Sequence, residues 1–293
     1  TGRTLVLRSA DVAAGTTIDG MGEDTTILIG PGSTIELQAL TIAGGGGALG
    51  SGVRGVDADM VLTECIIQGN VGQRGGGVAA TGGNLTIEQC WIHENTAIAG
   101  GGGVYHDGGQ AIIAASTIQG NDSGTAGGAV RHKSGEMTIQ DCWVGENVAN
   151  IAGGVDAYFA PVTFVNCTIL GNVGKMSAGG IRCASSEPLL SLVQDCAFCI
   201  NDPTDIVGYW DDLGGNAFSG DCDGNGRCDA EEIASGDAND CDGNGLPDVC
   251  DGDCNDNGFA DSCDILDGTS VDVNDNGVPD ECEDDCNENG IPD

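Results

Sequence analysis

Five acidic segments in the last quarter of the sequence repeat one arrangement of oxygen-bearing side chains. They begin at Asp221, Asp240, Asp253, Asp272 and Asp285. Each has Asp or Asn at its third position, Asn at its fifth, Gly at its sixth and Asp at its ninth, and the first four have an acid at the twelfth. Calcium takes six to eight oxygen ligands, and this spacing supplies them while glycine allows the sharp turn. The sequence therefore predicts a series of calcium-binding loops.

The predicted ligands are the side chains at positions 1, 3, 5, 9 and 12 of each loop and the backbone carbonyl at position 7. In chain order they are Asp221, Asp223, Asn225, Arg227, Asp229, Glu232, Asp240, Asp242, Asn244, Leu246, Asp248, Asp251, Asp253, Asn255, Asn257, Phe259, Asp261, Asp264, Asp272, Asn274, Asn276, Val278, Asp280, Glu283, Asp285, Asn287, Asn289, Ile291 and Asp293. The fifth loop has no twelfth position in this sequence, so we expect four complete loops and a fifth that another chain could complete.

The negative charge of the chain is concentrated in these loops. The 293 residues include 46 acidic and 9 basic ones, and residues 221–293, which we call the tail, hold 24 of the acids and a single base, Arg227. Such a surface repels nucleic acid and anionic membranes, and no basic cluster reverses this. The regular spacing of Gly, Asn and Cys also distinguishes the tail from a disordered acidic segment.

The cysteine content indicates an oxidising compartment. Eight of the 15 cysteines fall in the tail, and disulfides persist mainly in secreted and surface proteins. The sequence opens on Thr1 without a signal peptide and has no apolar run long enough to span a bilayer. We therefore expect a processed protein that is secreted, extracellular or on the cell surface.

A repeat of about 25 residues precedes the tail and is visible in three columns. One is Asn70, Asn95, Asn121, Asn147 and Asn172, continuing to Asn201 after a longer insertion. A second lies five positions upstream and is Cys65, Cys90, Ser116, Cys142, Cys167 and Cys196. The third is Val78, Val104, Val130, Val155 and Ile181, each preceded by small residues. Alternating apolar residues between these columns indicate short strands, so each repeat is expected to be one coil of an all-β parallel β-helix of about eight coils.

The combination of Ile-x-x-Asn with Gly-Gly-[Ala/Gly]-Val/Ile resembles the repeat of polymorphic outer-membrane proteins, as in the segment from Val162 to Asn172. The resemblance covers about residues 35–202 and implies a right-handed parallel β-helix. That family includes adhesins and surface proteins, while the same fold hosts polysaccharide lyases. The expected domains are a β-helix over residues 1–206, a linker over 207–220 and five calcium loops over 221–293.

Successive loop starts alternate between a longer and a shorter step, in a 19/13 spacing, so the repeating unit of the tail is a pair of loops. This leaves no room for the flanking helices of an EF-hand, and Pro247, Pro279 and Pro292 also oppose helix. The tail instead resembles thrombospondin type 3 repeats, which implies little regular structure around the bound ions. The apolar residues at position 7 are expected to bury against the β-helix or another subunit. Cysteines that appear or vanish together in the repeat suggest the pairs Cys250–Cys254, Cys282–Cys286, Cys241–Cys263 and Cys222–Cys228.

These features favour a calcium-binding structural or adhesive protein, with self-association into a homo-oligomer or filament as the sharper hypothesis. We see no nucleophile motif and no phosphate-binding loop in the sequence. Two alternatives stay open. A calcium-dependent polysaccharide lyase or glycosidase would use Arg131, Lys133, Asp156 and Arg182 on one outer face, beside inward-pointing His106 and His132. A carbohydrate-binding protein would use Trp91 and Trp143, which lie two coils apart.

Overall fold

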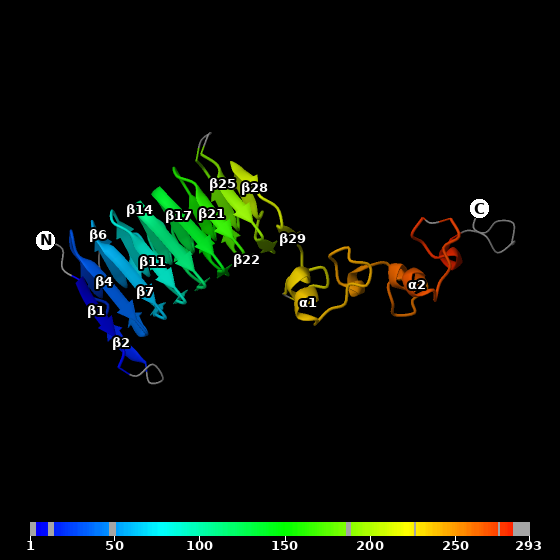
Figure 1. Ribbon diagram of the computed structural model, residues 1–293, viewed down its shortest axis with the longest axis horizontal. Coiled ribbons are helices and arrows are strands. Elements are labelled where there is room, and N and C mark those ends of the chain that lie inside the picture. The colour runs from blue at the N-terminus through cyan, green and yellow to red at the C-terminus, as the bar shows by residue number, and fades with distance from the viewer. Residues whose placement is uncertain are drawn as a thin grey trace. The chain divides into compact units, whose positions relative to one another are not determined.

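A computed structural model describes residues 4–10, 15–46, 51–185, 189–225, 227–274 and 276–283. The chain divides into two compact units, Thr1–Phe218 and Ser219–Asp293. Figure 1 shows the stacked strands of the first unit and the loops of the second. We describe each unit by itself.

The first unit is a parallel β-solenoid made of three sheets. The first sheet has 15 strands in two rows. One row is β1 (Thr4–Arg8), β4 (Thr34–Gln38), β7 (Asp59–Thr63), β11 (Leu85–Glu88), β14 (Val104–Ala114), β17 (Val130–Gln140), β21 (Val162–Val165), β25 (Ser191–Gln194) and β28 (Trp210–Asp212). The other row, which shares β14 and β17, is β3 (Ile27–Ile29), β6 (Val53–Val56), β10 (Val78–Thr81), β20 (Val155–Ala157), β24 (Ile181–Cys183) and β27 (Ile206–Gly208).

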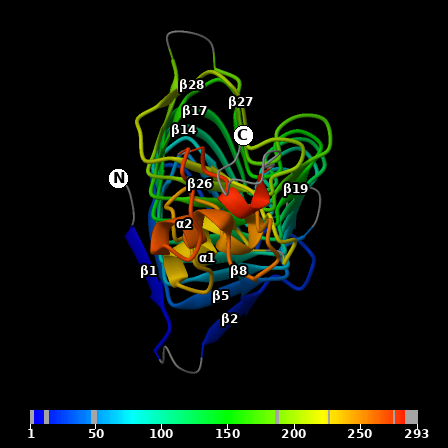
Figure 2. The ribbon, with the colours of Figure 1, turned by 90° about the vertical axis from the view of Figure 1, so that its right-hand side faces the viewer.

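The second and third sheets complete the coil, and Figure 2 shows β14, β8 and β19 on different sides of it. The second sheet contains β2 (Thr16–Asp19), β5 (Leu40–Ala43), β8 (Ile66–Gln68), β12 (Trp91–His93), β15 (Thr117–Gln119), β18 (Trp143–Gly145), β22 (Thr168–Leu170), β26 (Ala197–Cys199) and β29 (Ala217–Ser219). The third contains β9 (Val71–Gly72), β13 (Thr96–Ala97), β16 (Asp122–Ser123), β19 (Val148–Ala149) and β23 (Val173–Gly174).

The strand register confirms the coil length expected from the sequence. Trp91 lies opposite Ile66 on one side and Thr117 on the other, so one sequence repeat is one coil. Thr168 lies opposite Ala197, a longer step than in the earlier coils, which places the insertion before the last Asn of the column. The solenoid continues through β28 and β29, so strands occupy part of the segment 207–220 that the sequence suggested as a linker.

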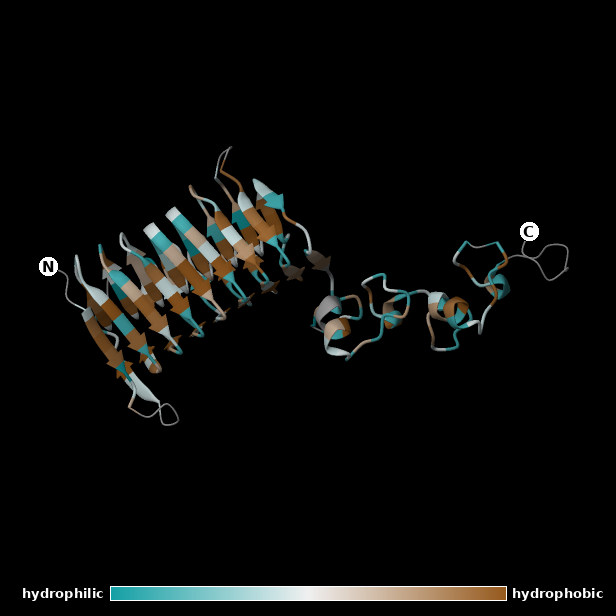
Figure 3. Ribbon diagram, in the orientation of Figure 1, coloured by the Kyte–Doolittle hydropathy of each residue, from teal (hydrophilic) through white to brown (hydrophobic). Residues whose placement is uncertain are grey.

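The core of the solenoid is a stack of apolar side chains from alternate strand positions. Along one inward row, Leu62, Ile87, Ile113, Ile139 and Phe164 occupy equivalent places on successive coils and are fully buried. Because a parallel coil repeats its register, like residues stack on like residues. Figure 3 shows the resulting alternation of hydrophobic and hydrophilic residues along the stacked strands. This alternation fixes which face of each strand is internal.

The asparagine column forms a buried ladder that runs through the solenoid. Asn121 Oδ1 accepts hydrogen bonds from the backbone N–H and the side-chain amide of Asn95, and Asn121 Nδ2 donates to the Ile92 carbonyl at 2.9 Å and to Asn147 Oδ1 at 3.0 Å. Gly120, directly before it, has a positive φ of 60°, so the chain turns sharply there. The ladder satisfies the amides that this corner would otherwise bury without partners.

The cysteine column forms a second ladder of free, buried thiols. The backbone N–H of Cys65 donates to Cys90 Sγ, that of Cys90 donates to the Ser116 hydroxyl, and that of Cys167 donates to Cys196 Sγ. The column therefore consists of small residues whose side chains accept a backbone amide from the neighbouring coil.

His106 and His132 point into the solenoid, as the alternation predicted. Their Nδ1 atoms lie 3.0 Å apart, the rings stack with centroids 5.1 Å apart, and both side chains are fully buried. Burial lowers the pKa of each imidazole to about 4. Both rings are therefore neutral near pH 7 and serve as core residues.

The tail contains short helical segments that the sequence analysis did not expect. Two α-helices, α1 (Asp229–Ser235) and α2 (Asp261–Asp267), begin at position 9 of the first and third loops and continue beyond position 12. Two 3-10 turns, η1 (Asp248–Cys250) and η2 (Asp280–Cys282), begin at position 9 of the second and fourth loops and end before position 12. Pro247 and Pro279 precede η1 and η2 instead of opposing them, because proline is compatible with the start of a helix. The α-helices occur only where the step to the next loop is the longer one, because only there is the segment between loops long enough for full helical turns.

Three disulfides join successive loops of the tail: Cys222–Cys250, Cys241–Cys263 and Cys254–Cys282. The expected pair Cys241–Cys263 is confirmed. The pairs Cys250–Cys254, Cys282–Cys286 and Cys222–Cys228 are wrong, and Cys286 itself lies outside the described residues. Position 2 of one loop pairs with position 11 of the next, where the Cα atoms come within 5.7 to 6.0 Å. Cys199 and Cys228 are disulfide-bonded as well.

Candidate functional site

The first position of each described loop organises the turn that follows it. In the third loop, Asp253 Oδ1 accepts the N–H of Asn257 at 3.1 Å and Asp253 Oδ2 accepts the N–H of Gly258 at 2.8 Å. The second and fourth loops repeat both bonds from Asp240 and Asp272. The carboxylate at position 1 thus accepts backbone N–H groups of the turn that follows it.

Positions 3 and 5 add further bonds of the same kind. Asp242 Oδ1 accepts the N–H of Asn244 at 3.0 Å, and Asn244 Oδ1 accepts the N–H of Leu246 at 2.7 Å. The bond from Asn244 lowers the pKa of Asp242, which keeps that carboxylate ionised. The equivalent bonds recur in the other three described loops. The four described loops therefore share the same bonds at positions 3 and 5.

The amide at position 5 reaches the acid at position 12 in all four described loops. The bonds run from Asn225 to Glu232 (2.7 Å), Asn244 to Asp251 (3.1 Å), Asn257 to Asp264 (2.6 Å) and Asn276 to Glu283 (2.7 Å). In the first two loops the same amide also donates to the carboxylate at position 3. The structure thus brings together positions 1, 3, 5 and 12, four of the five side-chain positions predicted as ligands.

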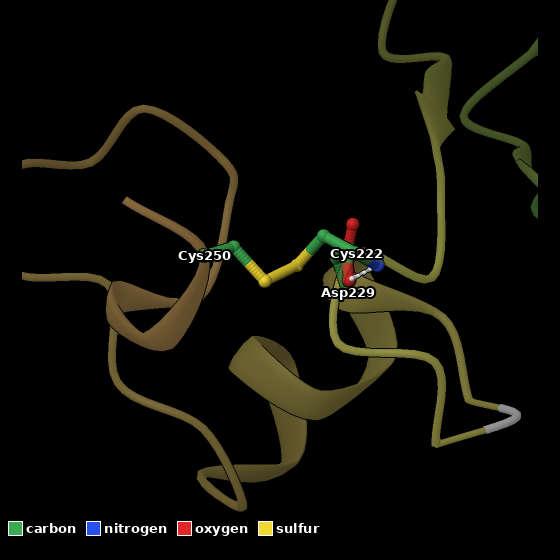
Figure 4. A group of neighbouring side chains, drawn as sticks. All are labelled: Cys222, Asp229 and Cys250. Atoms are coloured by element: carbon green, nitrogen blue, oxygen red, sulfur yellow. Dashed lines mark hydrogen bonds between the residues drawn. A yellow bond between two sulfur atoms is a disulfide. The ribbon is translucent and has the colours of Figure 1, made fainter. Parts of the chain in front are cut away.

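Position 9 has a contact that the sequence analysis missed. The carboxylates of Asp229, Asp248, Asp261 and Asp280 each accept the backbone N–H of position 2 of their own loop, at 2.8 to 3.0 Å. Figure 4 shows this bond from Cys222 to Asp229, beside the disulfide to Cys250. In the sequence, position 9 is Asp in every loop. An Asp could either bind an ion or accept the position 2 amide, so the sequence does not distinguish these two roles.

Buried carboxylate oxygens give a direct test of whether a cation fits these loops. Within the described residues, Glu232 Oε2 and Asp251 Oδ2, both at position 12, and Asp229 Oδ2 are buried and have no hydrogen-bond partner. A buried charged oxygen without a partner is costly, and a bound cation would remove that cost. The all-oxygen donor set suits a hard cation such as Ca²⁺. These residues therefore fit Ca²⁺, the ion that the spacing of the loop residues predicts.

Groups of two cysteines and one aspartate also lie close together in the tail, as in Cys222, Asp229 and Cys250. The sulfur atoms of each group form a disulfide. A disulfide sulfur is not a thiolate, so these groups lack the ligands that zinc requires. They act as cross-links between loops.

The apolar residues at position 7 stay partly exposed in the described loops. Leu246 is 39% exposed, Phe259 67% and Val278 38%. The tail therefore does not cover them itself, and their burial against another surface stays a prediction. Their carbonyls remain the predicted ligands of the loops, and the fifth loop, from Asp285 to Asp293, lies outside the described residues.

The basic residues proposed as enzyme candidates are held in ion pairs on the first sheet. Asp156 is fully buried and pairs with Arg182 (2.7 Å) and Arg131 (3.3 Å), and Lys133 pairs with Asp107 at 2.7 Å. Burial raises the pKa of Asp156, while Arg182 and Arg131 act in the opposite direction. Both arginines lie over the Tyr158 ring.

Asp156, expected on the outer face, is more covered than the alternation predicted, and so is Tyr105, which occupies the equivalent strand position two coils earlier. Asp156 lies beneath the arginines of the neighbouring strands, and Tyr105, only 3% exposed, lies beneath Arg74. Long side chains one coil away cover short ones, which a strand pattern alone does not reveal. Trp91 and Trp143, by contrast, lie on the outer face of the second sheet at equivalent places two coils apart.

The solenoid has a counterpart among known protein families. The family model described as "Right handed beta helix region" matches residues 25–194, more than half of the chain. No curated protein and no solved structure gave a match. Within the described residues, no helix is long and apolar enough to cross a membrane.

Proposed function

Because the chain belongs to the right-handed β-helix family, whose fold fits a structural or surface role, we propose that its tail binds calcium and is ordered by it. The single observation that carries the proposal is that position 5 bonds to positions 1, 3 and 12 in every described loop. Its backbone N–H donates to the side chains of positions 1 and 3, and its side-chain amide donates to the acid at position 12. Four loops with different flanking sequences hold this arrangement. An acidic loop without bound cations holds several like charges close together, which is unfavourable, and a bound ion would remove that cost.

Calcium would be held by the carboxylates and amides of these positions and by the carbonyl of position 7. The ion supplies positive charge and no redox chemistry, so its effect on the chain is structural. The protein contributes a glycine turn at position 6, the position 9 bond that closes each loop and a disulfide to the next loop. We further propose a secreted or cell-surface location, for which the disulfides are the supporting observation.

A matched pair of substitutions in the third loop tests the ligand assignment. Asp253→Asn removes a charge at position 1, whereas Asp256→Asn removes the same charge nearby, at an exposed position with φ of 55° that asparagine tolerates. Asp253→Asn is expected to lower the calcium affinity of one site by at least about tenfold, and Asp256→Asn to leave it nearly unchanged. Calorimetric titration of both variants measures this. Equal effects would show that only overall charge attracts the ion.

Self-association into an oligomer or filament is part of the same proposal. Its supporting observations are the exposed apolar residues Phe259 and Leu246 of the tail and the exposed Leu5 and Val6 on β1, which in the described sheet pairs only with β4. Exposed apolar side chains and open strand edges favour contacts with a second copy. Sedimentation in calcium, compared between the unaltered chain and Phe259→Ser, is expected to show a loss of oligomer. A monomer at every concentration would rule self-association out.

A further inference from the structure

Two tryptophans form a regularly spaced pair on the outer face of the second sheet. Trp91 on β12 lies opposite Thr117 on β15, which lies opposite Trp143 on β18. Strands of a sheet are about 4.8 Å apart, so the two rings are separated by roughly 10 Å along the solenoid. The intervening Thr117 is small and leaves the space between them open.

Each indole ring packs against the residue two positions further along its own strand. The Trp91 ring stacks on His93 of the same strand, with centroids 3.9 Å apart and an interplanar angle of 24°. The Trp143 ring lies over Gly145, at the equivalent place on its strand, where any Cβ would collide with the ring carbons. Trp91 is 43% exposed and Trp143 is half-buried. Both rings therefore keep part of their surface exposed on the outer face of the sheet.

The outward rows around the rings are uncharged and combine polar with apolar residues. The outward side chains of β8, β12, β15, β18 and β22 form two rows. The first residues of these strands are Ile66, Trp91, Thr117, Trp143 and Thr168, and the third residues are Gln68, His93, Gln119, Gly145 and Leu170. Burial lowers the pKa of His93, so its ring is neutral near pH 7. Acidic residues border the rows, and Glu146 accepts a hydrogen bond from Gln119 at 2.9 Å. This border disfavours a polyanion.

We propose that this face binds an uncharged β-1,4-linked hexopyranose chain laid along the solenoid axis. The C–H face of a sugar ring stacks on an indole face, and amide and hydroxyl side chains bond to sugar hydroxyls. In a β-1,4-linked chain every second ring presents the same face, at about the two-coil spacing of the tryptophans. Both glucose and N-acetylglucosamine polymers have this chemistry. The site is independent of calcium binding by the tail.

Fluorescence titration of the full chain in calcium with cellohexaose, and separately with chitohexaose, tests the proposal. Binding of at least one is expected, and the better ligand identifies the sugar. Trp91→Ala and Trp143→Ala should each weaken it by roughly tenfold, while Trp210→Phe, on the first sheet, should not. Absence of binding to either sugar at millimolar concentration, or Trp-dependent preference for polygalacturonate, would overturn the proposal.

Two further variants distinguish binding that requires the two-coil spacing of the tryptophans from binding to any exposed aromatic ring. Ile66→Trp combined with Trp91→Ala keeps two tryptophans but places them three coils apart, and it should bind as weakly as Trp91→Ala alone. Gly145→Ala should lift the Trp143 ring and weaken binding while both tryptophans remain. Full affinity in both variants would contradict the assigned geometry. Circular dichroism establishes that each variant retains the solenoid.

Discussion

Removal of calcium is expected to loosen the tail while the solenoid stays folded. The tail carries 24 acids and one base, so without bound cations its carboxylates repel one another at short range. The solenoid depends on stacked apolar residues and the Asn ladder, neither of which requires an ion. Amide hydrogen exchange, measured separately for each proteolytic peptide, should therefore become faster in residues 221–283 when a chelator is added. It should stay unchanged in residues 53–183.

Magnesium at equal ionic strength is the control for this experiment. Mg²⁺ requires a small octahedral site and retains its water, so it should protect the tail less than Ca²⁺ does. The three disulfides remain intact throughout and keep successive loops linked, so the tail should loosen without separating into free loops. Identical exchange in calcium, magnesium and chelator would mean that the loops fold without an ion.

Substitution of the central ladder residue, Asn121→Ala, is expected to destabilise the solenoid by about 3 to 5 kcal/mol. Asn121 is fully buried, and its amide donates to Ile92 O and Asn147 Oδ1 while its oxygen accepts from Asn95. Alanine would leave several of these buried groups without partners and open a cavity. Denaturant unfolding monitored by circular dichroism measures the loss.

Asn150→Ala is the matched control for that substitution. Asn150 is in the next coil and bonds to the Gly124 carbonyl at 2.6 Å, but that bond is exposed and water can replace it. Its loss should cost less than about 1 kcal/mol. Similar effects of the two substitutions would show that the ladder contributes no more than a surface hydrogen bond.

The solenoid could be predicted from the sequence because its constraints repeat. Asn70, Asn95 and Asn121 recur with the coil and each makes the same bonds, so a column in the sequence is a ladder in the structure. Alternating residues such as Leu85 and Ile87 show directly which face is buried. The burial of Asp156 and Tyr105 could not be predicted in this way, because it depends on how far Arg131 and Arg74 reach from other coils.

The disulfides of the tail show a second limit. The two-loop repeat makes Cys250 and Cys254 recur together, which fits a pair within one spacer as well as two pairs to neighbouring loops. Sequence spacing carries no information on which loop ends meet. In the structure, the position 9 carboxylate accepts the amide of position 2 of its own loop, and the cysteine at position 2 pairs with position 11 of the following loop. The ligand role of positions 1, 3 and 5, by contrast, stays a prediction.

Calorimetric titration of the full chain with calcium, after complete chelation and with the disulfides intact, tests the central claim most directly. In each of the four described loops, position 5 bonds to the side chains of positions 1, 3 and 12, so we expect at least one ion for each of them. Binding should saturate with calcium and be much weaker with magnesium. If no binding of calcium is detected, or if calcium and magnesium bind equally well, the assignment of the tail as a series of calcium loops is contradicted.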